Sequence, residues 1–228
     1  MAWRHYRHSN AIEEAMIRYD TSFRRLAFCL AGLAGFVDAV GFLGSGGLFV
    51  SFMSGNSTRM AIGIAEATTL ALAAAALIAL FVAGVFLTIL ASTKITFAHR
   101  KVVAISGVAA LLLGAACCKW AGSDVPATGL LCLAMGASNT IFRRDGEVSI
   151  GVTYMTGTLV KLGDRLADAA LGGSPTAWIP YLLLWLALVV GGILGAASYA
   201  WSPEASFGFA AAFALALIPV AQRLTATR

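Results

Sequence analysis

Two segments of this chain combine the residue types that bind small polar solutes: hydroxyl and amide side chains, glycine, and one basic residue at matching positions. They are FVSFMSGNSTRMAIGIAEA (49–67) and VSIGVTYMTGTLVKLGDRLADAA (148–170). Each passes from alternating β-branched or aromatic residues into helical composition, which predicts a short extended piece leading into a half-length helix. A helix N-terminus exposes unpaired N–H groups and a partial positive charge. Such a site suits an anionic or carboxylate-bearing solute.

The candidate site residues are the polar, glycine and basic positions at the start of each predicted half-helix, with one polar position upstream. Glycine lets the backbone approach a ligand closely, and a basic residue in each first turn adds positive charge. We predict that the solute is bound by Ser54, Gly55, Asn56, Ser57, Arg59, Thr156, Gly157, Thr158, Lys161 and Asn139. The alternative is that the polar side chains only cap the helices, while the two cations reach the interface or pair with carboxylates.

Asp38 is a carboxylate inside an apolar run, flanked by AGLAGFV and AVGFLG. In hydrocarbon such a group is costly unless it is paired, hydrated or protonated. Intramembrane carboxylates often couple transport to a proton or ion, so Asp38 is the predicted coupling residue. The alternative is a structural ion pair with Arg59 or Lys161.

The composition predicts that a bilayer surrounds these residues. Hydrophobic residues make up 59% of the 228 and charged residues 12%, whereas soluble domains have about 25% charged residues. The mean hydropathy is +0.83. Six apolar segments are long enough, or nearly so, to cross a bilayer. They are Phe23–Leu43, Thr68–Thr93, Val102–Trp120, Val125–Phe142, Trp178–Trp201 and Phe207–Val220.

An internal repeat relates the two halves of the chain. Met53 aligns with Met155 at an offset of 102 (155 − 53), and the Ser/Thr, Gly, Asn/Thr and Arg/Lys positions that follow align with it. Upstream, Asp38 aligns with Asn139 at an offset of 101 (139 − 38). We therefore divide the chain into an N-terminal interfacial segment (1–22), a first repeat (23–121), a second repeat (122–222) and a tail (223–228).

The basic residues flank the apolar segments, which is the pattern that orients membrane helices and gives no indication of nucleic-acid binding. If the two half-helix segments are re-entrant, every large basic cluster falls on the side of both termini. The expected fold is an all-α integral membrane protein with about six spans and two re-entrant motifs in an inverted 3+3 repeat. The expected location is the bacterial inner membrane with both termini cytoplasmic, and a homodimer is expected because so small a bundle encloses little.

No enzyme chemistry is predicted. The three histidines (His5, His8 and His99) lie in flanking segments, and the chain has no HExxH or phosphate-binding motif, so neither a metal nor a cofactor is expected. We favour a secondary transporter for a small solute. The alternatives are a channel or facilitator and a membrane sensor or structural protein.

The motifs GFVDAVGF, LFVSFMSGNSTRMA, AMGASNTIFRR and VTYMTGTLVKLGDRLA occur in this order, and in them the chain resembles the YoaK family of bacterial inner-membrane proteins. The resemblance extends over nearly the whole chain after Phe23. It implies a multi-spanning membrane protein and favours a transporter, but it supplies no substrate or reaction. The half-helix motifs also look like those of uracil-permease and sulfate-transporter folds, which have many more spans.

Overall fold

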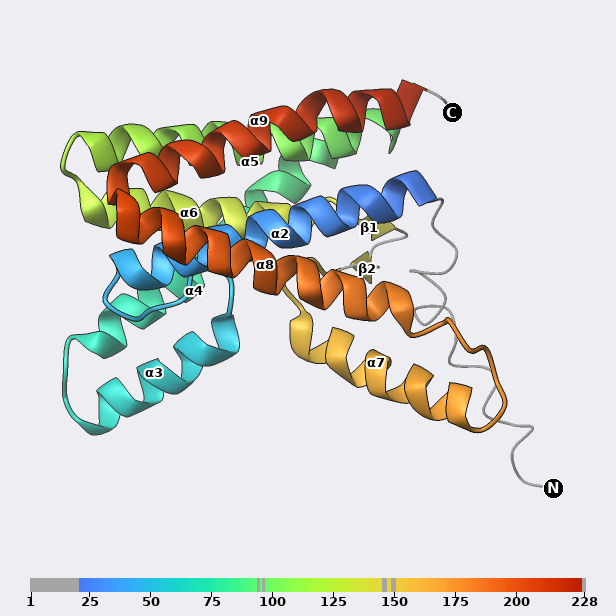
Figure 1. The fold of residues 1–228 in the computed structure, drawn as a ribbon. Coiled ribbons are helices and arrows are strands. Elements are labelled where there is room, and N and C mark those ends of the chain that lie inside the picture. Colours follow the sequence, from blue (N-terminus) through green and yellow to red (C-terminus); the bar gives the residue numbers. More distant parts are fainter. Residues whose placement is uncertain (1–20, 94, 96, 145–146, 149–150, 227–228) are drawn as a thin grey trace.

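The computed structural model describes residues 21–93, 95, 97–144, 147–148 and 151–226, and this part of the chain is almost entirely helical (Figure 1). Its helices are α2 (Thr21–Gly44), α3 (Met53–Ala65), α4 (Leu70–Thr93), α5 (Phe97–Trp120), α6 (Asp124–Ser138), α7 (Met155–Ala170), α8 (Ile179–Trp201) and α9 (Pro203–Ala226). Two-residue strands β1 (Arg143–Arg144) and β2 (Glu147–Val148) pair antiparallel. The predicted interfacial segment 1–22 lies almost wholly outside the described residues, as do the last two residues of the predicted tail.

Five helices in the described part of the chain are long and apolar enough to cross a membrane. The spans are Arg24–Gly44, Leu70–Thr93, His99–Trp120, Ile179–Trp201 and Pro203–Thr225. The fourth predicted span, Val125–Phe142, is instead a 15-residue helix that ends at Ser138. At about 1.5 Å per residue it is roughly 22 Å long, short of a hydrocarbon core of about 30 Å. Five of the six predicted segments are therefore helices of full span length, and the fourth is a shorter apolar helix that ends earlier than the sequence predicted.

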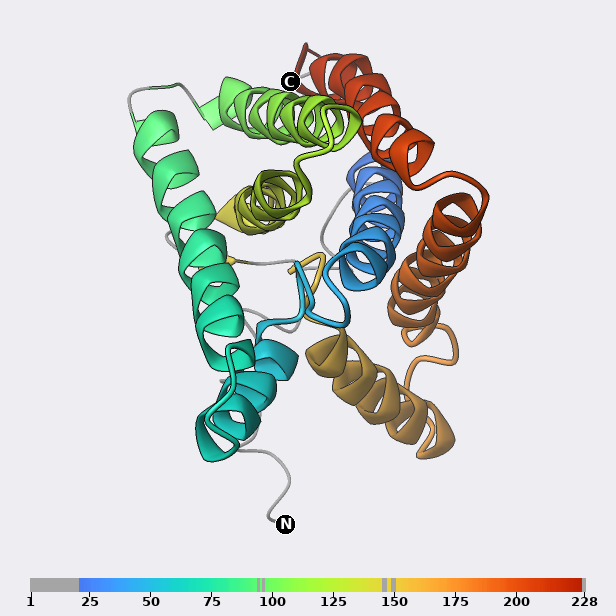
Figure 2. The same ribbon diagram turned by 90° about the vertical axis from the view of Figure 1, so that its left-hand side faces the viewer.

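The early end of α6 follows from its last polar residues. Ser138 Oγ and Asn139 Nδ2 both donate to the carbonyl of Met135, at 2.7 and 3.0 Å, and Thr140 Oγ1 donates to the carbonyl of Ala137 at 2.8 Å. Side chains that bond nearby carbonyls compete with the continuing helix. The short helix lies at the centre of the bundle, between α4, α5 and α2 (Figure 2), where neighbouring helices cover it.

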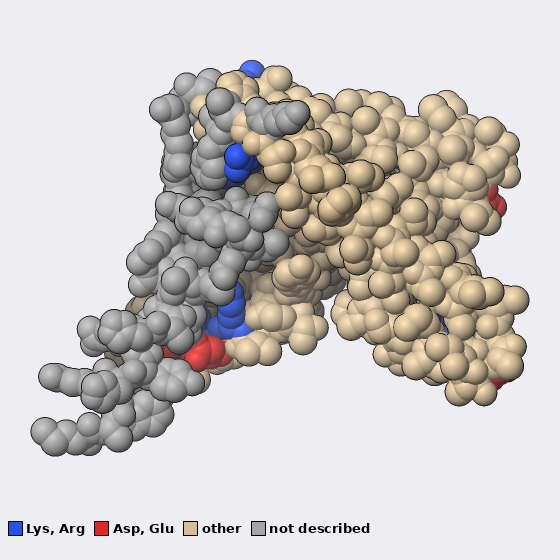
Figure 3. Space-filling view, turned by 180° about the vertical axis from the view of Figure 1, so that it is seen from behind, with Lys and Arg blue, Asp and Glu red and all other residues tan. Residues whose placement is uncertain are grey.

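The outer helices α4 and α8 present large apolar side chains outward. Leu72 and Ile193 are 75% and 62% exposed. In the view from behind, nearly all of the described surface is uncharged (Figure 3). A surface of this kind belongs in lipid, because water-soluble monomers rarely expose large contiguous apolar patches.

Glycines bring two helix pairs into backbone contact. α2 packs on α8, and α4 packs on α6. A β-carbon added at Gly35 of α2 would overlap the Leu188 carbonyl of α8, and one added at Gly136 of α6 would overlap the Phe81 carbonyl of α4. Small residues at such contacts are typical of membrane helices, whose association depends on close packing.

The half-length helices α3 and α7 begin at Met53 and Met155, the two residues that the internal repeat aligns. They begin near each other beside the middle of the long helices and run apart toward opposite ends of the bundle (Figure 1). α3 packs on α4, and α7 packs on α8. Their starts, rather than their ends, therefore come together.

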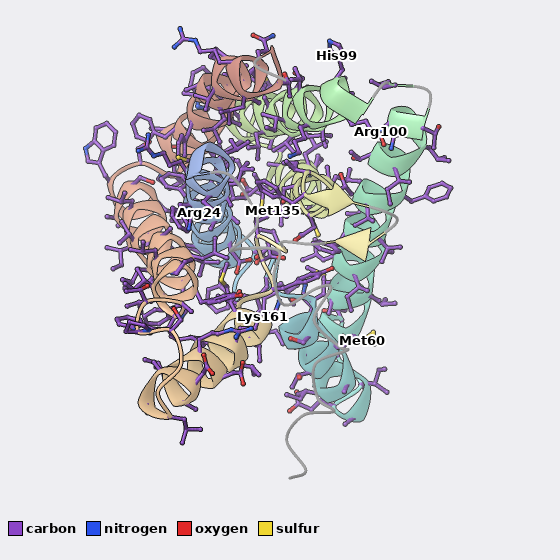
Figure 4. The ribbon with its side chains drawn as sticks, turned by 90° about the vertical axis from the view of Figure 1, so that its right-hand side faces the viewer. Arg24, Met60, His99, Arg100, Met135 and Lys161 are labelled. Carbon is purple, nitrogen blue, oxygen red and sulfur yellow. The ribbon has the colours of Figure 1, made fainter. Side chains whose placement is uncertain are left out.

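The basic residues that begin the long helices gather at one end of the bundle. Arg24 at the start of α2 and His99 and Arg100 at the start of α5 all lie at the end nearest the viewer in Figure 4. The opposite end holds the turn between α5 and α6, where Lys119 Nζ and Asp124 Oδ1 form an ion pair at 2.7 Å. The predicted boundary between the repeats, at residues 121–122, falls in this turn.

Candidate functional site

A cavity of about 370 Å³ lies where the two half-helices begin. Its walls come from the residues that lead into α3 and α7, the first turns of both helices, and one side chain of α4. The lining residues are Ser51, Phe52, Met53, Ser54, Phe81, Thr153, Tyr154, Met155, Thr156 and Gly157. Of the residues predicted from the sequence, Ser54, Thr156 and Gly157 line it. The lining contains no charged side chain.

Both helix starts leave hydrogen-bond donors at this cavity. The N-cap residues Phe52 and Tyr154 make no side-chain capping bond. In the described part of the chain, the amides of Ser54, Thr156 and Gly157 meet no acceptor, as expected for the first turn of a helix. Together with the hydroxyl groups of Ser54, Tyr154 and Thr156, they form a donor-rich patch beside aromatic rings and thioethers. Such a patch can receive an anion or a carbonyl-type acceptor.

Asn56 lies beside the cavity and has a structural role. Its Nδ2 donates to the Phe49 carbonyl at 2.6 Å, and its Oδ1 accepts from the Phe49 amide at 2.9 Å. The side chain is fully buried. These two bonds hold the extended segment before α3 against the first turn of the helix. For Asn56, the structure therefore agrees with the alternative in which the polar side chains cap the helix.

The other predicted side chains at the helix starts also bond their own helix or pack beside it. Ser57 Oγ donates to the Met53 carbonyl at 2.9 Å, and Thr158 Oγ1 donates to the Tyr154 carbonyl at 3.3 Å. The Phe49 and Phe52 rings cover Gly55, whereas a β-carbon at Gly157 would meet no atom within 4 Å. The second helix start is therefore the more open of the two.

Neither predicted cation lines the cavity. The Arg59 guanidinium lies 5.6 Å from the centroid of the Phe42 ring, next to Gly47 in the turn after α2. Lys161 is half-buried on α7 (Figure 4). Within the described chain neither residue forms an ion pair with Asp38, so the pairing alternative for Asp38 is absent from this structure.

Asp38 and its repeat mate Asn139 each hold the segment that leads into a half-helix. Asp38 Oδ1 accepts the amides of Val50 and Ser51 at 3.0 and 2.8 Å. Asn139 Oδ1 accepts the Thr153 hydroxyl at 3.1 Å. Because Ser51 and Thr153 line the cavity, both upstream polar residues bond to its walls, and neither lines it.

Asp38 also lines a second cavity, of about 320 Å³, between α2 and α8. Ser51 lines the first cavity and Asp38 lines the second, so the hydrogen bond from the Ser51 amide to Asp38 connects the two. No group of three or more His, Cys, Asp or Glu side chains that could hold a metal occurs among the described residues.

Sequence reasoning missed most of the lining. Ser51 and Thr153 have the same offset of 102 (153 − 51) as the two methionines, so the repeat itself carried that signal. The aromatic pair Phe52 and Tyr154 shares this offset too. Phe81 comes from a neighbouring helix, and no local pattern marks it.

A profile of the family described as "Protein of unknown function (DUF1275)" matches residues 26–220. The chain belongs to the DUF1275 family. One relative, a UPF0700 transmembrane protein of Rhizobium meliloti (strain 1021), is 32% identical over 171 residues, which cover 75% of this chain and 73% of the relative. No solved structure matches the chain.

The family assignment agrees with the helices. The relative's name describes a transmembrane protein, and the described chain has five helices of membrane-spanning length. This DUF1275 protein is therefore a multi-pass membrane protein whose solvent is the lipid bilayer. The resemblance to the YoaK family, drawn from four motifs, is confirmed at the level of the family.

Proposed function

We propose that this protein is a secondary transporter that binds a small solute between the starts of α3 and α7. The observation that carries the proposal is the cavity of about 370 Å³ shared by the two half-helices. Irregular backbone at membrane depth is tolerated where it lines a wet cavity, and broken helices that meet at their N-termini are the usual solute site of secondary transporters. The hydrogen-bond donors favour a solute with an anionic or carbonyl group, and the backbone amides, rather than Arg59 and Lys161, receive it.

In the proposal the two halves are inverted repeats and α3 and α7 are re-entrant. The helix pairings support this. α2 packs on α8 as α6 packs on α4, and α5 packs on α6 as α9 packs on α2. α5 and α9 pack on each other, as a pair on a pseudo-twofold axis would. Such an axis in the membrane plane brings the two helix starts to the midplane from opposite faces.

The proposed orientation places the end with Arg24, Arg100 and Arg223 in the cytoplasm of a bacterial inner membrane. These residues lie at the start of α2, the start of α5 and the end of α9, and positively charged flanks favour the cytoplasmic side. Both termini are then cytoplasmic. A reporter enzyme active only outside the membrane, fused after Arg228, should stay inactive, whereas the same reporter inserted after Gly122 should be active.

A homodimer completes the proposal, because among the described residues α3 packs mainly on α4 and α7 mainly on α8, and each helix has exposed side chains. Ile64 and Val160 are 66% and 69% exposed, as is the side chain of Asp164 at 61%. Polar and charged groups at membrane depth need protein cover. Light scattering of the detergent-purified protein should give twice the 23.6 kDa chain mass. A single-chain mass over the working concentration range would contradict the dimer.

In the proposal Asp38 couples solute movement to a proton. Its carboxylate holds the amides of Val50 and Ser51, and protonation weakens a carboxylate as an acceptor. Weakening these two hydrogen bonds loosens the wall of the solute cavity at Ser51. Asn139 holds the second motif through Thr153 and does not titrate, so the coupling is confined to the first motif.

The solute is identified first by thermal stabilisation of the purified protein with small anions, carboxylates, amino acids, nucleobases and cations. Gly157→Leu should then lower uptake of the stabilising solute at least about tenfold, because the new side chain projects into the solute cavity. Gly163→Leu is the matched control. It lies on the same helix, a β-carbon there also meets no atom within 4 Å, and it is outside the cavity lining.

Uptake into proteoliposomes decides between transport mechanisms. Accumulation above the outside concentration, driven by a pH gradient, supports the secondary transporter. Uptake that only equilibrates the solute would support the channel or facilitator instead. Equal uptake by Gly157→Leu and Gly163→Leu would place the solute path elsewhere.

A further inference from the structure

When the Asp38 carboxyl group is ionised, no basic side chain of the described chain pairs with its charge. Its hydrogen-bond donors are neutral: the amides of Val50 and Ser51 and the hydroxyl of Ser51. The ion pairs found among the described residues do not include it. The titratable group on α6 that Asp38 influences is Cys132, whose thiol donates to the Leu77 carbonyl of α4 at 3.0 Å. The α8 wall contributes no titratable side chain. From α3, the Arg59 guanidinium lies 5.6 Å from the centroid of the Phe42 ring, which also lines this cavity. Burying such a charge requires a proton or a cation from solution.

The cavity beside Asp38 is large enough for a small organic ion. It is an open pocket of about 320 Å³, whereas one liquid water occupies about 30 Å³. The rings of Phe42 and Phe49 form one wall, with centroids 4.8 Å apart. The facing wall of α8 is small and apolar, at Leu188, Gly192 and Ala196. Aromatic faces beside a single carboxylate attract cations that carry carbon groups.

We propose that this second cavity binds a small organic ammonium ion, with its charge at the Asp38 carboxylate and its carbon groups against Phe42 and Phe49. A strongly hydrated metal ion is a poorer fit, because oxygen ligands other than the carboxylate are lacking among the lining side chains. The lining has room for the ion between α2 and α8. The site is separate from the solute cavity and shares no lining residue with it.

The two cavities are nevertheless linked through one hydrogen bond. Asp38 lines the second cavity, and its Oδ1 accepts the amide of Ser51 at 2.8 Å, while Ser51 lines the first cavity. A bound cation keeps Asp38 ionised and so strengthens its hold on Ser51. A proton and the ammonium ion therefore compete for the same carboxylate with opposite effects on the wall of the solute cavity.

The test is calorimetric titration of the detergent-purified full chain with choline and with 3,3-dimethylbutan-1-ol, its uncharged carbon isostere. Choline keeps its charge at every pH, so a change of pH alters the protein alone. We expect saturable binding of choline at least about tenfold tighter than binding of the alcohol. Acidification should weaken choline binding, because protonated Asp38 no longer attracts the cation. Equal affinity for the two compounds would overturn the proposal.

Two variants locate the binding site. Asp38→Asn should lower choline affinity at least about tenfold. Ala196→Leu should do the same by filling the cavity while Asp38 stays in place, so the test survives if Asp38→Asn fails to fold. Ala197→Leu is the matched control, because Ala197 is the next residue on α8, is exposed, and lies outside the lining. Unchanged affinity in Ala196→Leu, or the same loss in Ala197→Leu, would contradict this site.

Neither the binding measurement nor these α8 variants depend on transport. A protein that accumulates solute yet binds no choline keeps the proposed function and loses this site. A protein that binds choline at Asp38 and only equilibrates its solute loses the transporter mechanism and keeps the site.

Discussion

Replacing Asp38 with asparagine should abolish solute accumulation driven by a pH gradient while leaving the fold and solute binding in place. The amide oxygen of asparagine can still accept the amides of Val50 and Ser51, which lie 3.0 and 2.8 Å from Asp38 Oδ1. In the second half of the chain an asparagine stands at the corresponding position, and its Oδ1 accepts one hydrogen bond, from the Thr153 hydroxyl. An asparagine cannot bind a proton, so the link between the gradient and the cavity wall is lost.

The measurement is the ratio of inside to outside solute in proteoliposomes with and without an imposed pH gradient. We expect the accumulation ratio of Asp38→Asn to fall at least about tenfold, toward one. Asp124→Asn is the control carboxylate variant, since Asp124 is exposed and pairs with Lys119 at the end of the bundle, and it should accumulate solute normally. If Asp38→Asn still follows the pH gradient, the coupling role of Asp38 is wrong.

The sequence allowed the half-helices to be predicted well because the signal was repeated. The Met-Ser/Thr-Gly motif occurs twice, and both helices begin at its methionine, Met53 or Met155. A repeat provides two independent indications of the same local structure. Asp38 was chosen as a candidate residue for a different reason. A carboxylate within an apolar run is easily noticed in a sequence, and it is costly in a bilayer.

The roles of individual side chains could not be read from the same motif. Asn56 and Ser54 are two residues apart with similar polarity, yet Asn56 is buried on Phe49 and Ser54 lines the cavity. The neighbouring helix determines which side of a helix start faces a cavity. Here that helix is α4, whose Phe81 lines the cavity. Arg59 likewise lies over Phe42, a contact across the turn between α2 and α3. These contacts depend on the tertiary structure and have no pattern in the local sequence.

The length of α6 was misjudged because apolar composition continues beyond the end of the helix. The segment up to Phe142 is apolar enough for a span, but Ser138, Asn139 and Thr140 bond back to carbonyls within the helix. Hydropathy averages over a window and does not register this local competition. A helix at the centre of a bundle also has no need to match the bilayer thickness.

Alanine at Gly136 should strongly destabilise the protein, although it adds a single methyl group. The β-carbon would overlap the Phe81 carbonyl and lie 3.2 Å from the Val85 amide nitrogen, so α4 and α6 would have to separate along their backbones. Overpacking of this kind costs about 3 kcal/mol, and rigid backbone offers no rotamer for relief. The midpoint of thermal unfolding in detergent measures the loss.

Gly107→Ala is the matched control, because a β-carbon at Gly107 in α5 meets no atom within 4 Å. Removing a helical glycine from open space should stabilise the helix by about 0.5–1 kcal/mol. The two substitutions are the same chemically and should shift the midpoint in opposite directions. Equal midpoints for both variants would mean that α4 and α6 are farther apart than the structure shows.

The same experiment tests the proposed repeat. Gly35 corresponds to Gly136 at an offset of 101 (136 − 35), and their overlapping carbonyls, Leu188 and Phe81, differ by 107 (188 − 81). The reverse contacts keep both offsets. Gly191 meets the Gly32 carbonyl as Gly84 meets the Leu133 carbonyl, with differences of 107 (191 − 84) and 101 (133 − 32).

Two halves related by a pseudo-twofold axis should therefore respond alike to alanine at corresponding glycines. We expect Gly35→Ala to lose about as much stability as Gly136→Ala, and Gly84→Ala about as much as Gly191→Ala, each by about 3 kcal/mol. A protein that tolerated alanine in one half and unfolded with it in the other would have unequal helix pairs. The solute cavity would then lie between two dissimilar halves, and the midplane position that the proposed transporter requires would lose its structural basis.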